Sequence, residues 1–191
     1  MPGIFKLRRG RGPIDLAVDM AGVRLGERVL QAGVADPRVF AKLAGKAGLT
    51  GRACVVVDNA EAGRLVEAAA GREGVLVEVA VADSGQWPYE DSSFDVGLLD
   101  GNALLGADAA ARRGRIDDMK RAVRPGGRVI VLRSWPMGLA GRLGLTGERA
   151  EHREGTNALL EALQAAGFRP VRLLTEREGF TFVEGFRPTS P

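Results

Sequence analysis

The sequence contains few of the residues from which many catalytic and structural sites are built. Its 191 residues include one cysteine, Cys54, and one histidine, His152, with a single tyrosine and two tryptophans. A lone cysteine excludes a disulfide framework, and together with one histidine it provides no cluster with the spacing of a metal site. We therefore expect no metal ion and a reducing compartment, the cytoplasm.

Long apolar runs are also missing. No run approaches the roughly 18 residues that a membrane-spanning helix needs, and no apolar segment of signal-peptide length follows the basic residues near the N-terminus. The net charge of +3 is small and favours a solvated surface over nucleic-acid binding. The composition predicts a flexible basic arm at 1–13 and a single domain at 14–191, with no membrane partner.

Residues 29–58 carry the pattern around which the chain is organised. An apolar run at 29–33 ends in a glycine, and Asp36 can then cap a helix with its side-chain oxygen. Apolar residues recur at helical spacing, and a second apolar run at 53–57 stops at Asp58. Strand, turn, helix, strand and acid in this order are typical of an open α/β sheet that binds a nucleotide-like ligand at its carboxyl edge.

The rest of the chain continues the alternation of strands and helices. Further strands are predicted at 75–81 (buried on both faces except near Glu78), 94–99, 128–132, 171–175 and 180–186. Helices are predicted at 13–21, 59–71, 107–123 and 159–166, and irregular structure at 133–155. Parallel strands need helical crossovers, whereas the last two strands are joined by a short turn and must be antiparallel. The predicted fold is α/β, a doubly wound, mostly parallel seven-stranded sheet with a C-terminal antiparallel hairpin. A solvated helix face is expected for the arginines at 112, 113, 115, 121 and 124.

Motifs in the second half of the chain resemble those of a known family. The segment DSGQWPYEDSSFDV (83–96) is similar to the family's acid followed by a Pro-aromatic pair and Ser-Phe-Asp, and RAVRPGGRVIVL (121–132) contains its Pro-Gly-Gly turn. The stretch AAGFRPVRLLTEREGFTFVEGFRP (165–188) resembles its Ala-Gly-Phe and closing hairpin. This family is the class I S-adenosylmethionine-dependent methyltransferases, most nearly the small-molecule group that includes quinone-biosynthesis enzymes.

The resemblance implies S-adenosylmethionine as cofactor and a set of binding residues at the strand ends. Gly33 would let the backbone approach the methionine part, Asp58 would accept hydrogen bonds from both ribose hydroxyls, and Asp83 would accept one from the adenine amino group. Asp58 and Asp83 could instead cap a strand end and a turn. The implied cofactor-binding set is Gln31, Gly33, Ala35, Asp58, Asn59, Asp83, Ser84 and Asp100.

The resemblance also implies transfer of a methyl group to a small-molecule acceptor. In-line displacement at a sulfonium methyl needs alignment more than a catalytic triad. Asp100, at the end of a strand, and His152, in the irregular segment, are the candidates for a base. Their structural interpretations are a turn former and a solvent-exposed loop residue.

Departures from the family pattern leave two other functions open. Gln31, Ala35 and Pro37 stand where the family has an acid and glycines, and a neutral Gln31 could lower cofactor affinity by roughly tenfold. This departure also fits a non-catalytic relative that binds a partner protein. A nicotinamide-dependent oxidoreductase could use Asp58 too, but its fingerprint needs glycine at positions 33, 35 and 38, and only Gly33 complies.

Overall fold

The computed structural model describes residues 13–34, 36–83, 87–135, 148–177 and 179–189. Its centre is a seven-stranded sheet in the order β3-β2-β1-β4-β5-β7-β6. Strands β1 to β5 are parallel, and β7 pairs antiparallel with both β5 and β6, which confirms the predicted fold class. The strands are β1 Arg28–Ala32, β2 Arg52–Val57, β3 Glu78–Val81, β4 Phe94–Asp100, β5 Val123–Ser134, β6 Val171–Arg177 and β7 Phe180–Phe186.

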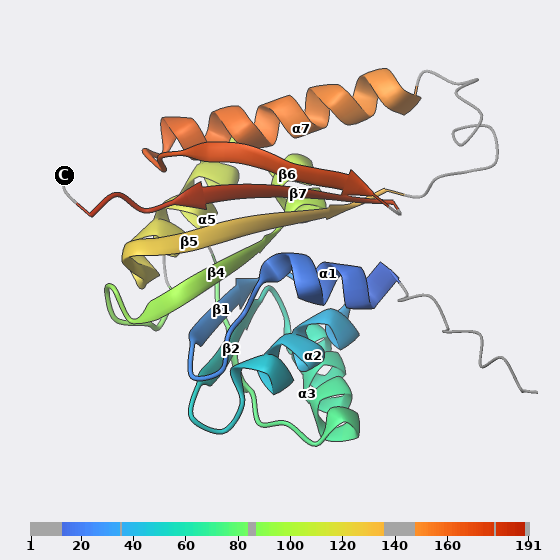
Figure 1. Cartoon of the computed structure of the whole chain (residues 1–191), viewed down its shortest axis with the longest axis vertical. Coiled ribbons are helices and arrows are strands. Elements are labelled where there is room, and N and C mark those ends of the chain that lie inside the picture. The colour runs from blue at the N-terminus through green and yellow to red at the C-terminus, as the bar shows by residue number, and fades with distance from the viewer. Residues whose placement is uncertain (1–12, 35, 84–86, 136–147, 178, 190–191) are drawn as a thin grey trace, which may run out of the picture.

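Helices cover both faces of the sheet (Figure 1). They are α1 Pro13–Ala21, α2 Pro37–Ala47, α3 Ala60–Glu73, α4 Gly101–Gly106, α5 Ala109–Ala122 and α7 Glu148–Ala165. Apolar residues of α1 and α2 share one core cluster with Val29 of β1 and Leu98 of β4. Apolar residues of α5 and α7 share another cluster with Leu30 and Leu99, the residues that directly follow Val29 and Leu98 in the chain. This split follows from the alternation of side chains along each strand. In the described part of the chain, no helix combines the length and apolarity needed to cross a membrane.

Helix caps expected from the sequence are present. The Asp36 side chain accepts a hydrogen bond from Arg38 N at 2.9 Å, with Pro37 in the first turn of α2. Asn59 caps α3 in the same way by accepting from Ala62 N at 2.9 Å. These caps fix the directions in which α2 and α3 leave the carboxyl ends of β1 and β2.

Several elements differ from the sequence-based expectation, among them β5, which begins at Val123 and not at residue 128. The third strand begins at Glu78 and is an edge strand with Val81 56% exposed, so the prediction of a strand at 75–81 buried on both faces is wrong. A short helix, α4, follows β4 where none was predicted. Helix α7 begins at Glu148, inside the segment expected to be irregular, and residues 136–147 of that segment lie outside the described ones.

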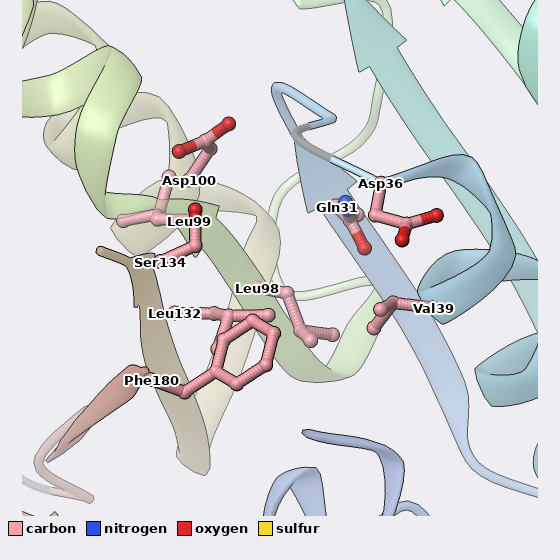
Figure 2. Close-up of a pocket in the computed structure, with 9 residues that line it drawn as sticks. All are labelled: Gln31, Asp36, Val39, Leu98, Leu99, Asp100, Leu132, Ser134 and Phe180. Carbon is pink, nitrogen blue, oxygen red and sulfur yellow. The ribbon is translucent and has the colours of Figure 1, made fainter. Parts of the chain in front are cut away.

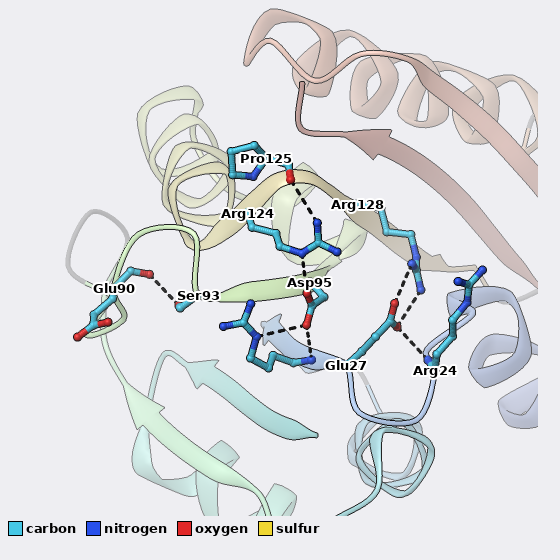
Figure 3. Close-up of polar contacts among 9 residues, drawn as sticks. Arg24, Glu27, Glu90, Ser93, Asp95, Arg124, Pro125 and Arg128 are labelled. Atoms are coloured by element: carbon cyan, nitrogen blue, oxygen red, sulfur yellow. Dashed lines mark hydrogen bonds and ion pairs between the residues drawn. The ribbon is translucent and has the colours of Figure 1, made fainter. Parts of the chain in front are cut away.

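A charged network holds the amino ends of the central strands together (Figure 3). Asp95 accepts hydrogen bonds from Arg28 N at 2.8 Å and from Arg124 Nε at 2.6 Å, and Glu27 pairs with Arg128. Burial opposes ionisation of Asp95, but the bonds from Arg124 and Arg28 outweigh it and hold the pKa of this carboxyl below its ordinary value. Asp95 therefore has a structural role at the amino ends of the strands, the end of the sheet opposite to their carboxyl ends.

His152 is buried on α7, so the expectation of a solvent-exposed loop residue is wrong. Its ring stacks on Trp135 with centroids 4.2 Å apart, and Nε2 lies 3.1 Å from Glu176 Oε1 and 2.9 Å from Thr181 Oγ1. Burial lowers the pKa of His152 from its ordinary value, and Glu176 offsets this only in part. The imidazole therefore links α7 to the β6–β7 hairpin, and its burial favours the neutral form.

Because His152 is the only histidine, its titration is directly observable. We expect its imidazole resonance to report a pKa below 6.5. The unfolded chain then binds more protons than the folded one in this pH range. The contribution of His152 to the free energy of unfolding is therefore fully present above pH 6.5, and it is lost as the pH falls through the lower pKa of the folded state. Chemical denaturation between about pH 7.5 and 5 measures this slope.

The control for this experiment is His152→Asn, which removes the titrating ring and should flatten the slope in that pH range. A folded-state pKa at or above 6.5, or an unchanged slope in the variant, would contradict the assignment.

Candidate functional site

A pocket of about 230 Å³ opens at the carboxyl ends of β1, β4 and β5 (Figure 2). Its lining residues are Gln31, Asp36, Val39, Leu98, Leu99, Asp100, Leu132, Ser134 and Phe180. The chain leaves β1 toward β2 on one side and reaches β5 from β4 on the other, so the strand order reverses at this point. Open α/β sheets bind their ligands in the crevice at such a reversal.

The pocket has a polar half and an apolar half. In Figure 2 the polar side chains of Asp100, Ser134, Gln31 and Asp36 surround one end. Val39, Leu98, Leu132 and Phe180 converge at the other end. These apolar residues belong to the core cluster on the α1–α2 face of the sheet. The pocket can therefore bind a ligand that has both polar and apolar groups.

Gln31, which lines the pocket, carries a buried unpaired acceptor. Its side chain is largely buried, and Nε2 donates a hydrogen bond to the carbonyl oxygen of Gly33 at 2.9 Å. The other amide atom, Oε1, is buried without a hydrogen-bond partner, and Figure 2 shows the Gln31 side chain among the residues that line the pocket. An unmet buried acceptor costs about 1–3 kcal/mol. A ligand that brings an N–H or O–H group to this atom would remove that cost.

Gly33 forms the turn that brings this loop against the neighbouring strand. Its φ angle is +71°, a conformation that side chains disfavour, and a Cβ atom added there would lie 3.0 Å from Asp100 Cβ. Gly33 N also donates to the carbonyl oxygen of Val56 at 3.0 Å. Glycine is thus required for both the turn and the close approach to the end of β4.

The two carboxylates at the pocket already have partners within the chain. Both oxygens of Asp36 bind Arg38, at 3.0 and 2.7 Å, and these bonds lower the pKa of the carboxyl. Asp100 Oδ1 accepts from Asn102 N at 2.9 Å and from Ala103 N at 3.2 Å, so Asp100 caps α4 as well as lining the pocket. The structure thus supports the turn-forming role of Asp100 and also brings it to the site.

Ser134 is a pocket residue that the sequence reasoning missed. Asn102 Nδ2 donates to both Ser134 O at 2.8 Å and Ser134 Oγ at 2.9 Å, which fixes the hydroxyl at the mouth. Ser134 lies directly opposite Phe180 in the antiparallel pair of β5 and β7. Only this register shows that both residues face the pocket, because they are far apart in the sequence.

The residues expected at the nucleoside lie outside the pocket, at the ends of β2 and β3. Asp58 Oδ1 accepts a hydrogen bond from Arg115 Nη2 at 2.9 Å, and Asp83 is exposed just beyond β3. The Asn59 side-chain oxygen is used to cap α3. Two further predicted positions, Ala35 and Ser84, fall outside the described residues.

His152 is not brought to the pocket. Directly opposed residues of an antiparallel pair share a face, and successive residues alternate between faces. Ser134 pairs with Phe180 on the pocket face, so the next pair, Arg133 with Thr181, points to the other face. His152 contacts this second pair. Of the two candidates for a base, only Asp100 lies at the pocket.

The arginines of α5 do not form one solvated face, contrary to expectation. Arg112 donates to the carbonyl oxygens of Leu104 and Ala107 at the end of α4, at 2.8 and 3.1 Å. Arg121 donates to Tyr89 O at 2.6 Å in the loop before β4. Among these residues Arg113, 61% exposed, fits the expectation. The arginines thus tie α5 to the loops around the sheet.

Comparisons with known proteins agree with this architecture. No protein-family model matches the chain. The sequence is 30% identical over 118 residues to a ubiquinone/menaquinone biosynthesis C-methyltransferase of Cupriavidus taiwanensis, a match that covers 60% of this chain. The chain spans only 46% of the length of that curated relative.

Solved structures match over nearly the whole chain. A S-adenosylmethionine-dependent methyltransferase of Aquifex aeolicus superposes with a TM-score of 0.68 at 15% identity, covering 91% of this chain and 89% of that one. A S-adenosylmethionine-dependent O-methyltransferase of Thermotoga maritima superposes with a TM-score of 0.67 at 17% identity, covering 92% and 64%. The chain therefore has the fold of the class I S-adenosylmethionine-dependent methyltransferases, and its sequence resembles their quinone-biosynthesis group.

Proposed function

We propose that the protein is a S-adenosylmethionine-dependent methyltransferase that acts on a small-molecule acceptor. The observation that carries this proposal is the pocket at the β1–β4 reversal, which is lined by Gln31, with its unpaired Oε1, and by Asp100, against which the turn at Gly33 lies. A fold alone does not define an activity, so the proposal depends on the residues of this site.

The residues present fit this cofactor in two parts. A volume of about 230 Å³ is below the roughly 300–1,000 Å³ of pockets that enclose a whole drug-sized ligand. We therefore assign the pocket to the methionine end of the cofactor and the methyl acceptor. The nucleoside would lie across the exposed strand ends, with its ribose at Asp58 and its adenine toward Asp83.

The chain's own groups would position the reactants and exclude water. When bound, S-adenosylmethionine supplies a methyl group on a positively charged sulfur. Gln31 Oε1 would accept a hydrogen bond from the cofactor's ammonium group, and the apolar half of the pocket would hold the acceptor in line with the methyl. Asp100 Oδ2 would take the proton where the acceptor must lose one.

The acceptor and the compartment belong to the same proposal. The relative's name assigns it a C-methyl transfer in quinone biosynthesis, and we extend to this chain only the class of small-molecule acceptor. We place the protein in the cytoplasm because its one cysteine, Cys54, is buried and unpaired in β2. Burial raises the pKa of the Cys54 thiol to about 12, which suits packing and not chemistry.

Calorimetry with S-adenosylhomocysteine tests the cofactor assignment. We expect saturable binding by the full chain, and we expect Asp58→Ala to weaken it about tenfold because charge-assisted hydrogen bonds to the ribose are lost. Asp117→Ala is the matched control, since the Asp117 side chain is 48% exposed on α5 and pairs with Arg113 there, within the same helix. Absence of heat at millimolar ligand would favour the non-catalytic, partner-binding alternative.

A second prediction concerns the neutral residue in the first loop. In Gln31→Glu a carboxylate oxygen faces the Gly33 carbonyl and cannot donate to it. We expect this to lower the free energy of unfolding of the free protein by about 1–3 kcal/mol at pH 7. Gln31→Ala loses the same hydrogen bond without adding a charge. Denaturation of the two variants in parallel therefore separates the effect of the lost hydrogen bond from that of the added charge. Stability of the Glu variant equal to that of the parent would refute this role.

A further inference from the structure

Arg115 reaches the candidate nucleoside site from the opposite face of the sheet. Its Nη2 atom donates to Asp58 Oδ1 at 2.9 Å, across 57 positions of sequence. The two partners differ in exposure, because the Arg115 side chain is 19% exposed and the Asp58 side chain 57%. The arginine is thus held within the protein, while the carboxylate faces solvent at the end of β2.

Packing of α5 explains how Arg115 reaches this place. The next residue, Ile116, is fully buried in the same core cluster as Cys54 and Val56 of β2. Arg115 therefore starts on the face of the sheet that α5 covers, and its long apolar stem can follow the protein surface toward the end of β2. Arg112, one turn earlier, anchors α5 to the end of α4 and limits movement of the helix.

The pair has a consequence for a ligand at Asp58. With Oδ1 engaged by Arg115, the carboxylate is restricted in rotation and its Oδ2 atom remains for ligand hydroxyls. A group ordered before binding loses less conformational entropy when the ligand arrives. We propose that Arg115 is a positioning residue of the nucleoside site, which orients Asp58 toward the ribose hydroxyls. This inference rests on the proposed function.

The same helix provides a matched control. Arg113 pairs with Asp117 within α5 at 2.7 Å, and both side chains are largely exposed. An exposed pair of this kind contributes little to stability. Arg113→Ala therefore removes an arginine of equal charge from the same helix without touching Asp58.

The experiment is a cycle of S-adenosylhomocysteine affinities measured by calorimetry. Arg115→Ala should weaken binding by about threefold to tenfold, Arg115→Lys should restore part of the loss, and Arg113→Ala should leave affinity unchanged. In the Asp58→Ala background, Arg115→Ala should have no further effect, because Arg115 acts through that carboxylate. Equal losses in both backgrounds would overturn the inference.

A second measurement separates positioning from a structural role. Adenosine and 2′,3′-dideoxyadenosine differ only in the two ribose hydroxyls. Arg115→Ala should therefore weaken the binding of adenosine and leave the affinity for the dideoxy compound unchanged. Loss of both affinities together, or of neither, would contradict the proposal. If the parent protein binds S-adenosylhomocysteine and Arg115→Ala binds it equally well, this inference alone fails. If the parent protein binds neither it nor adenosine, the proposed function fails first.

Discussion

The close packing of the β1–α2 turn against the end of β4 is the constraint on which the site depends. Strands β1 and β4 lie side by side in parallel, and the chain leaves them toward opposite halves of the sheet. A pocket can form there only if the turn after β1 fits against the end of β4 without a steric clash. Gly33 allows this fit because its φ is positive and it has no side chain. The pocket walls then come from elements on both sides of this junction.

Local signals in the sequence were enough to predict most of the fold. The caps at Asp36 and Asn59 and the apolar runs between them are short-range features, and the structure confirms them. Burial of the third strand was predicted wrongly because it depends on strand order, which places β3 at the edge. The start of α7 was missed because its polar N-terminal residues are anchored by long-range contacts of His152 with Glu176 and Thr181.

Residues of the candidate site could be predicted where they follow strands, and not where they become neighbours through strand register. Gln31 and Asp100 lie at the pocket, with Gly33 against Asp100, because the carboxyl ends of adjacent parallel strands lie at one end of the sheet. Ser134 and Phe180 become neighbours only through the antiparallel pairing of β5 with β7. Arg115 reaches Asp58 through the packing of a helix on the other face, which no sequence spacing encodes.

Gln31 shows that a residue that departs from the family pattern can have a structural role in the loop. A carboxylate would attract a cation more strongly, since charged hydrogen bonds are about twice as strong as neutral ones. It would also lack the donor that holds the Gly33 carbonyl, in a loop that has Pro37 and fewer glycines than the family pattern. The amide can meet both demands, because one atom fixes the turn and the other remains for a ligand. In this loop, a neutral side chain therefore attracts a cation less strongly than a carboxylate would, but it holds the turn in a defined geometry.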